Sequence, residues 1–413
     1  MKEYLELLKK RPGFRNLWFA SVVSLLGDWF NTIASVMIVN RYTETDLAIS
    51  WILIAKTLPR FFLGPLAGVL ADRVNRKWVM FASDVLRAGI VLSFLFVDRP
   101  ERVWLIYALT VAQFIVASFF EPASSAILPG LVEGEEELVT ANVLSSITWS
   151  AMLALGAAAG GVVAGLFGAE AALVIDSGTF LVSAVLVLRV KYDQAAVETQ
   201  AVTSGFRDLI DGFKYVVKER GMGFLVMIKS IGQIGSGDIL MVVFAERYFP
   251  LGEEGATSLG IMFAAAGLGS IIGPLIARVF SGTTSGQLRG LIQKSYLLIP
   301  LGWIIFALAP SLWVVCVGAA VRMMGVSINW TYSNVLIQYQ VPDRFLGRVF
   351  SIDLGLFTLA NSTSVLLTGI FLDSFRVEPR GMLTFFAAAS FAMGVVLAIT
   401  AGRQRGTKKT GEA

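Results

Sequence analysis

Ionisable side chains inside long apolar stretches are the residues of this sequence that could do chemistry. We single out seven of them: Asp28, Lys56, Arg60, Asp176, Lys229, Asp238 and Arg322. A charge in the hydrocarbon region of a bilayer costs roughly 2.5–3.5 kcal/mol on insertion scales, so it needs a partner or a water-filled path. We therefore expect the seven to line a central cavity that takes substrate and protons.

The position of Asp28 gives the sharpest hypothesis. Asp28 lies near the middle of the first apolar stretch, and Lys56 and Arg60 share one face of the second at i,i+4 spacing. We expect Asp28 to face these two cations and to act as a protonation-sensitive switch. The alternative is a permanent structural ion pair, because buried pairs both shift pKa values and hold helices together. Asp84 and Arg87, three residues apart, are expected to form such a structural pair.

The composition excludes several other kinds of site. The chain has no histidine and one cysteine, Cys316, which excludes disulfide frameworks, Cys/His zinc sites and histidine general bases. We expect no metal and no cofactor. A Gly-rich nucleotide loop of the Walker type is also absent from the sequence, so any transport would be secondary. A membrane-embedded sensor or enzyme is the weaker alternative, because no nucleophile is paired with a base.

The elements that carry these residues are membrane spans. Of the 413 residues, 55% are hydrophobic and 15% are charged, which rules out a soluble globule and predicts an all-α polytopic membrane protein. Apolar runs between Gly, Pro and charged breaks predict twelve transmembrane helices, near 16–40, 47–71, 77–97, 103–124, 140–167, 171–190, 223–248, 256–280, 290–309, 312–338, 349–372 and 381–402. The first run is too long for a signal peptide and is interpreted as a retained helix.

The spans predict two six-helix bundles. The domains are an N-terminal bundle at 1–190, a linker at 191–221, a C-terminal bundle at 222–402 and a tail at 403–413. Apolar residues at helical spacing between Phe206 and Val217 predict an amphipathic helix on the membrane surface, with a solvated linker helix as the alternative. A weak repeat, Leu63–Leu66 and Ile272–Leu275, supports the division into two halves.

The distribution of basic residues predicts the orientation. With twelve spans, most of the lysines and arginines fall on the side that holds both termini. The other side holds Arg41, Arg99, Arg102, Arg247, Arg376 and Arg380. The positive-inside rule therefore places both termini in the cytoplasm, in a multi-pass protein of the cell membrane. This distribution also explains the net charge of +4 without nucleic acid as a partner.

The segment from Gly68 to Lys77, between the second and third spans, carries the most specific motif. Its sequence, GVLADRVNRK, resembles the signature loop G-x-L-a-D-R-x-G-R-K of the major facilitator superfamily. The resemblance implies a conformational latch formed by Gly68, Asp72, Arg73, Arg76 and Lys77. Asn75 replaces the second glycine of the family motif. Asparagine tolerates a left-handed backbone, so we expect the turn to survive.

Further stretches narrow the resemblance to one branch. They are Leu58-Pro59-Arg60 with Gly64-Pro65, Ser83–Arg87, Glu121-Pro122-Ala123, Leu138 with Ala141-Asn142, and Val341–Arg348. In this order they resemble the macrolide efflux and enterobactin exporter branch. Two features depart from proton-coupled exporters of the superfamily: the fourth span has no central arginine, and Gly156–Gly161 lacks the expected proline.

The resemblance implies a major facilitator fold with a cavity between two bundles and alternating access. We expect a secondary active transporter that exports a small amphipathic molecule, drug-like or siderophore-like, as a proton-coupled antiporter. A lysophospholipid or lipid flippase and an uncoupled facilitator are the alternatives within transport. The expected partners are the small-molecule substrate, protons and membrane lipids, and the monomeric state is implied by the family.

Overall fold

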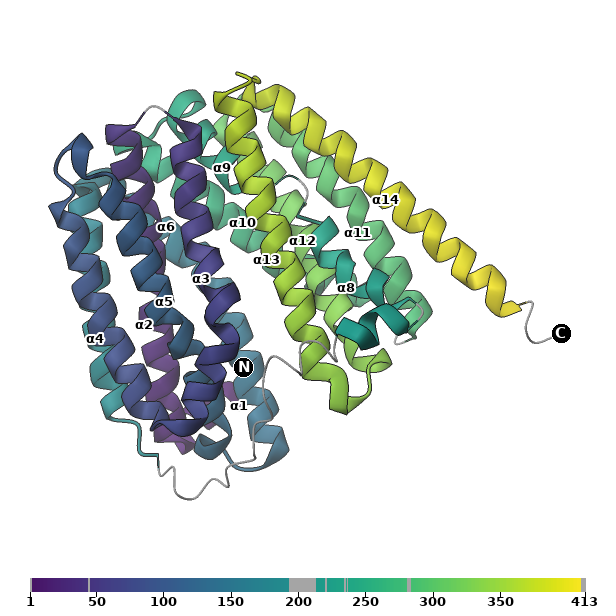
Figure 1. Cartoon of the computed structure of the whole chain (residues 1–413), viewed down its shortest axis with the longest axis horizontal. Coiled ribbons are helices and arrows are strands. Elements are labelled where there is room, and N and C mark those ends of the chain that lie inside the picture. Colours follow the sequence, from purple (N-terminus) through teal and green to yellow (C-terminus); the bar gives the residue numbers. More distant parts are fainter. Residues whose placement is uncertain are drawn as a thin grey trace. The chain divides into compact units, whose positions relative to one another are not determined.

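The computed structural model describes residues 2–43, 45–192, 213–219, 221–233, 235, 237–280 and 284–409. For residues 2, 60, 64–73, 237, 343–344 and 397–409 it describes the backbone alone. Every regular element in these ranges is helical, as predicted (Figure 1). The longer helices are α1 Lys2–Lys10, α2 Pro12–Tyr42, α3 Asp46–Arg73, α4 Arg76–Ser93, α5 Trp104–Ile127, α6 Gly134–Leu188, α8 Met222–Ile231, α9 Gly237–Val243, α10 Ala256–Phe280, α11 Ser285–Ala307, α12 Leu312–Gln340, α13 Asp343–Asp373 and α14 Pro379–Lys409.

Nine of the described helices are long and apolar enough to cross a membrane. One of them, α6, has 55 residues, and at about 1.5 Å per residue it is far longer than the roughly 30 Å of a bilayer core. Gly168 interrupts it with a φ of 85°, a conformation that glycine adopts without a steric penalty. This break falls between the predicted fifth and sixth spans.

The chain forms two compact units. The first contains residues 1–208 with 241–264, and the second contains 209–240 with 265–413. Within the first unit α2 packs along α6, and α5 packs against α3 and α4 (Figure 1). Within the second unit α11 packs against α12 and α14, and α8 packs against α12 and α13.

The predicted seventh span is not one continuous helix. α8 ends at Ile231 and α9 begins at Gly237, and a π-helical turn, η5 Phe244–Tyr248, completes the stretch. The prediction of one continuous helix over 223–248 was therefore wrong. The interruption coincides with three glycines between residues 232 and 237, and one of them, Gly235, has a φ of 83°.

The predicted amphipathic linker helix lies largely outside the described residues. Residues 213–218 are helical, and within them the Tyr215 ring stacks on Phe345 with centroids 4.5 Å apart. This part of the linker thus packs on the beginning of α13 in the second unit.

Asn75 stabilises the turn before α4, but not through the left-handed backbone conformation that we expected. Its φ is −61°, so the backbone is not left-handed. The Asn75 side chain instead accepts hydrogen bonds from the backbone N–H groups of Lys77 (3.1 Å) and Trp78 (3.4 Å). Asparagine is among the preferred N-cap residues because its oxygen satisfies N–H groups that lack a helical partner.

An ion-pair network fastens α1 and the start of α2 to the start of α6. Lys10 and Arg11 donate hydrogen bonds to Glu137, both at 2.8 Å, and Arg11 also pairs with Glu133. The side-chain hydrogen bond from Arg11, followed by the one from Lys10, lowers the pKa of Glu137 to about 2. The carboxylate is therefore ionised throughout the physiological pH range.

Acidification should remove the stabilisation that this network provides. A pKa lowered on folding stabilises the folded state above the unfolded pKa of about 4.3, and this contribution disappears as the pH falls towards 2. We expect Glu137→Gln to lower the thermal stability slightly at pH 7 and to match the wild type near pH 2. Unfolding followed by tryptophan fluorescence between pH 2 and 7 measures this. A constant difference across the range would contradict the expectation.

Candidate functional site

Asp28 in α2 forms its ion pair with Arg87 in α4. The Arg87 Nη2 and Asp28 Oδ1 atoms are 2.5 Å apart, and the side chains are 3% and 23% exposed. Arg87 also donates to the Ser24 hydroxyl at 3.3 Å, and its guanidinium lies 3.9 Å from the Phe180 ring centroid. Since a guanidinium is charged at every physiological pH, Arg87 is a fixed positive charge beside Asp28.

Two further carboxylates surround this pair. Asp84 Oδ1 lies 3.8 Å from Arg87, and Asp84 Oδ2 accepts a hydrogen bond from Ser183 at 2.6 Å. Asp176 is fully buried in α6, and a Cβ atom at Gly27 would overlap its carboxylate. Neither Asp84 Oδ1 nor Asp176 Oδ2 accepts a hydrogen bond from the part of the chain that the structure describes. The three carboxylates and Arg87 are named here the carboxylate cluster.

Lys56 is linked to the backbone of Asp28 through the Thr32 hydroxyl. The Lys56 ammonium donates to the Thr32 hydroxyl, which donates to the Asp28 carbonyl oxygen at 2.6 Å. We predicted that Asp28 faces Lys56 and Arg60. The ion-pair partner of Asp28 is instead Arg87, so this part of the prediction was wrong. Spacing along one helix shows which residues share a face, but it does not show which neighbour that face meets. The Arg60 side chain lies outside the described residues.

The predicted pairing of Asp84 with Arg87 was incomplete. The i,i+3 contact is present at 3.8 Å, but the shorter contact of Arg87 is the one with Asp28. The residues assigned to a separate structural pair and the residue assigned to the switch thus belong to one cluster.

The second unit contains its own buried ion pair. Lys229 in α8 pairs with Asp353 in α13, and both side chains are 2% exposed. The ammonium also donates to Asn334 Oδ1 at 2.5 Å and lies 4.6 Å from the Trp330 ring centroid. Sequence reasoning predicted Lys229 but missed Asp353 and Asn334. An acidic residue within the apolar stretch 349–372 was the available signal for Asp353.

Arg322 stabilises the interruption between α8 and α9. Its side chain is 4% exposed, donates to the Gly235 carbonyl oxygen at 3.4 Å and lies over the Trp303 ring. The Gly235 N–H donates to the Ser364 hydroxyl at 3.0 Å. These contacts satisfy backbone groups that an unbroken helix would pair internally. Asp238, in the first turn of α9, attracts Arg322 electrostatically.

The predicted latch loop is described in part. For Gly68, Asp72 and Arg73 the structure describes the backbone alone. Arg76 donates to the Ala126 carbonyl oxygen at 2.8 Å and to the Tyr192 hydroxyl at 2.9 Å, so it joins the starts of α4 and the linker to the end of α5. Lys77 lines a cavity together with residues at the end of α6.

Residues at the other end of the first unit form a network that sequence reasoning missed. Arg41, at the end of α2, donates to Glu170 at 2.6 Å and to Glu253 at 2.7 Å. Arg247 donates to Asp46 at 2.7 Å. Both arginines were among the few cations on the side with few basic residues, which was the available signal. The network ties 241–264, from the second half of the sequence, to α2 and α6.

Small residues bring α6 and α10 into close contact beneath this network. A Cβ atom at Gly161 would lie 2.6 Å from Gly260 Cα and 2.7 Å from the Ala256 carbonyl oxygen. The absence of a side chain at Gly161 thus allows a close backbone contact between α6 and α10.

Gly161→Ala should destabilise the first unit, whereas Gly178→Ala should not. Both glycines lie in α6, so both changes bring the same gain in helix propensity, but a Cβ at Gly178 meets nothing within 4 Å. Overpacking against a backbone costs about 1–3 kcal/mol. Thermal unfolding of the two variants in detergent checks this, and equal melting temperatures would contradict the packing described.

Comparison of the sequence with protein families and with curated proteins gives matches over most of the chain. The family model described as transmembrane secretion effector matches residues 8–404. The putative bacilysin exporter of Bacillus subtilis is 25% identical over 83% of this chain and 84% of its own length. Macrolide efflux protein A of Streptococcus pyogenes is 25% identical over 88% of this chain and 90% of its own.

Solved structures with a similar fold are transporters. A POT family transporter in complex with 5-aminolevulinic acid superposes with a TM-score of 0.77 at 10% identity, covering 95% of this chain and 96% of that one. The nucleoside transporter NupG superposes with a TM-score of 0.70 at 13% identity, covering 97% and 99%. At these identities the similarity shows the fold alone.

Proposed function

Since this chain belongs to the transmembrane secretion effector family of the major facilitator superfamily, and is thus a transporter and not an enzyme, we propose that it exports a small amphipathic molecule by proton antiport. The substrate class is a drug-like or siderophore-like compound. The export direction rests on the bacilysin and macrolide exporters among its relatives. We place both termini in the cytoplasm and the protein in the cell membrane, in accordance with the positive-inside rule.

The carboxylate cluster is the observation that supports the proposed proton coupling. Among the side chains that the structure describes, counted as ionised, Asp28, Asp84 and Asp176 exceed Arg87 and the nearby Lys56 by one negative charge, so one proton balances these five residues. Asp28 is the most exposed of the three carboxylates, which makes it the entry point for a proton. The mobile charge is then carried by a carboxyl group, as expected in a chain without histidine.

A change of charge at Asp28 is well placed to move helices. Asp28 lies on α2, Arg87 on α4 and Asp176 on α6, and the end of α2 carries Arg41. Protonation of Asp28 weakens its attraction to Arg87 and so changes how α2 is held against α4. In the proposed cycle, the Arg41 network to Glu170 and Glu253 opens when substrate leaves and closes again when the protein returns.

Transport by inside-out membrane vesicles tests the proposal. In these vesicles export becomes uptake into the lumen, and an acidic lumen supplies protons that leave as substrate enters. We expect vesicles with the protein to accumulate a radiolabelled macrolide or bacilysin, and a protonophore to abolish the accumulation. Uptake that is unchanged by the protonophore would overturn antiport and favour an uncoupled facilitator or a lipid flippase.

A further inference from the structure

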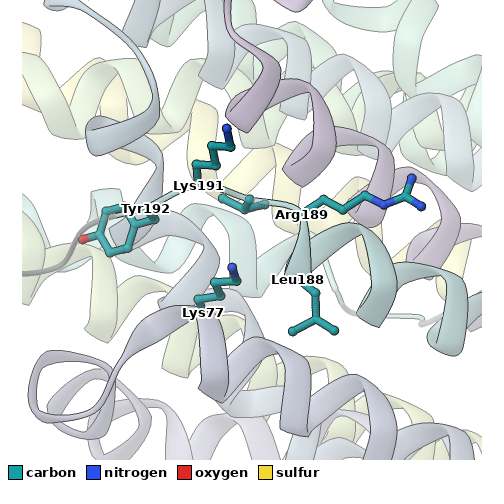
Figure 2. Close-up of a pocket in the computed structure, with 6 residues that line it drawn as sticks. Lys77, Leu188, Arg189, Lys191 and Tyr192 are labelled. Carbon is teal, nitrogen blue, oxygen red and sulfur yellow. The ribbon is translucent and has the colours of Figure 1, made fainter.

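A cavity of about 810 Å³ lies at the end of α6, away from the carboxylate cluster. It is lined by Lys77 from the first turn of α4 and by Leu188, Arg189, Val190, Lys191 and Tyr192 at the end of α6 and beyond (Figure 2). α4 and α6 pack against each other, so the cavity lies where two neighbouring helices reach the same end of the first unit. The distribution of basic residues assigns this end to the cytoplasm.

The charge of the cavity lining is positive. Lys77, Arg189 and Lys191 contribute three cations, and no carboxylate lines the cavity. None of the three side chains forms an ion pair with a residue that the structure describes. Lys10 and Arg11, at the same end of the unit, are in contrast paired with Glu133 and Glu137. The cavity therefore concentrates positive charge that no described carboxylate neutralises through an ion pair.

The cavity walls are held in place by contacts outside the cavity. The Tyr192 hydroxyl accepts a hydrogen bond from Arg76, and its ring lies close to Gly130, where a Cβ would approach to 2.8 Å. Asn16 donates to the Arg189 carbonyl oxygen at 3.3 Å. In Figure 2 the ammonium groups of Lys77 and Lys191 extend in the same direction, whereas the Arg189 guanidinium extends away from them. Lys77 and Lys191 are thus the two lining cations whose side chains share a direction.

An apolar surface leads to the cavity along α6. Leu181, Val185 and Leu188 lie at i, i+4 and i+7, and all three side chains are exposed. Trp78, next to Lys77, is 55% exposed, as expected for an aromatic residue at the headgroup level of a bilayer. A soluble anion would need only the cations, whereas a lipid uses both the cations and the apolar surface.

We propose that this cavity binds the phosphate headgroup of an anionic lipid of the cytoplasmic leaflet, between Lys77 and Lys191. The acyl chains lie along Leu181, Val185 and Leu188. Each lysine or arginine near the cytoplasmic surface of a membrane increases the affinity for anionic lipids by about fivefold. Because Lys77 lies in the first turn of α4 and Lys191 follows α6, a bound lipid connects the start of α4 to the end of α6.

Thermal stabilisation of the purified full-length protein by soluble short-chain phosphatidylglycerol tests the proposal. A ligand that binds only the folded state raises Tm, and the stabilisation grows with the logarithm of one plus the ratio of the free ligand concentration to Kd. We expect phosphatidylglycerol to raise Tm, and phosphatidylcholine with the same chains and inorganic phosphate to leave it unchanged. The double variant Lys77→Gln/Lys191→Gln should weaken the apparent affinity for phosphatidylglycerol by about thirty-fold.

Lys9→Gln provides the matched control, because it removes one exposed lysine from the same end of the unit but outside the cavity. We expect it to keep the wild-type affinity. The Tm values without lipid report whether each variant is folded. Equal stabilisation of the double variant and the wild type would overturn the site. Stabilisation by inorganic phosphate at the same concentration would overturn the lipid as its occupant and identify a soluble phosphate instead.

Discussion

Asp28→Asn should reduce gradient-driven transport to the level of vesicles without the protein, a loss of at least about tenfold. The amide keeps the size of the side chain but has no proton to release, and it leaves Arg87 as a permanent cation beside Asp84. If the carboxyl group carries the coupling proton, exchange of substrate across the membrane without a gradient should persist. Accumulation of a radiolabelled macrolide or bacilysin in acid-loaded inside-out vesicles measures the loss.

Asp98→Asn is the matched control for this change. Asp98 is also an aspartate of the first unit, but its side chain is 51% exposed and its partners are the surface residues Arg99 and Arg102. The control should transport like the wild type. A normal gradient-driven accumulation by Asp28→Asn would remove Asp28 from the coupling mechanism. A loss of both accumulation and folded protein would indicate a structural ion pair instead, which Tm reports directly.

Lys229→Met should be strongly destabilising, by about 3–5 kcal/mol, because it leaves Asp353 as an unpaired charge in a buried position. The double variant Lys229→Met/Asp353→Leu should recover most of this loss, since replacing both partners of a buried pair by apolar residues is often neutral or stabilising. Asn334 accepts a hydrogen bond from the Lys229 ammonium in the wild type. In both variants Asn334 loses this bond, but its side-chain amide still has its own N–H donors and oxygen acceptor. Unfolding of the wild type, Lys229→Met, Asp353→Leu and the double variant in mixed detergent micelles gives the coupling energy.

A double variant that is as unstable as Lys229→Met alone would show that the two charges do not compensate each other. Transport by the recovered double variant adds a second result. We expect it to retain proton-coupled accumulation, because the carboxylate cluster belongs to the first unit and is unchanged. Loss of coupling in a stable double variant would place a second titrating pair in the second unit.

The helical fold and the family could be predicted from the sequence because they depend on properties that extend over many residues. Long apolar runs predict helices that lie where the structure has them, and the loop at Gly68–Lys77 preserves the family motif. The break between α8 and α9 could not be predicted in this way. It depends on one glycine with a positive φ and on the distant side chains of Arg322 and Ser364, which satisfy its backbone.

The candidate site was predicted in its residue types but not in its pairing. An intramembrane charge needs a partner, so Asp28, Asp176, Lys229 and Arg322 could be recognised as unusual. Which partner it meets depends on how helices pack. Arg87 is assigned to Asp28 by the packing of α4 and α2 against α6, and Asp353 is assigned to Lys229 by the packing of α13 against α8. No spacing within one helix contains that information.

Proton movement during transport tests the central claim most directly. Inside-out vesicles that enclose a pH-sensitive dye are given an acidic lumen, and a macrolide or bacilysin that the vesicles accumulate is added outside. The proposed antiport predicts that the lumen becomes more alkaline when substrate is added, in the wild type and in Asp98→Asn but not in Asp28→Asn. Substrate uptake by the wild type without any change in luminal pH would contradict it.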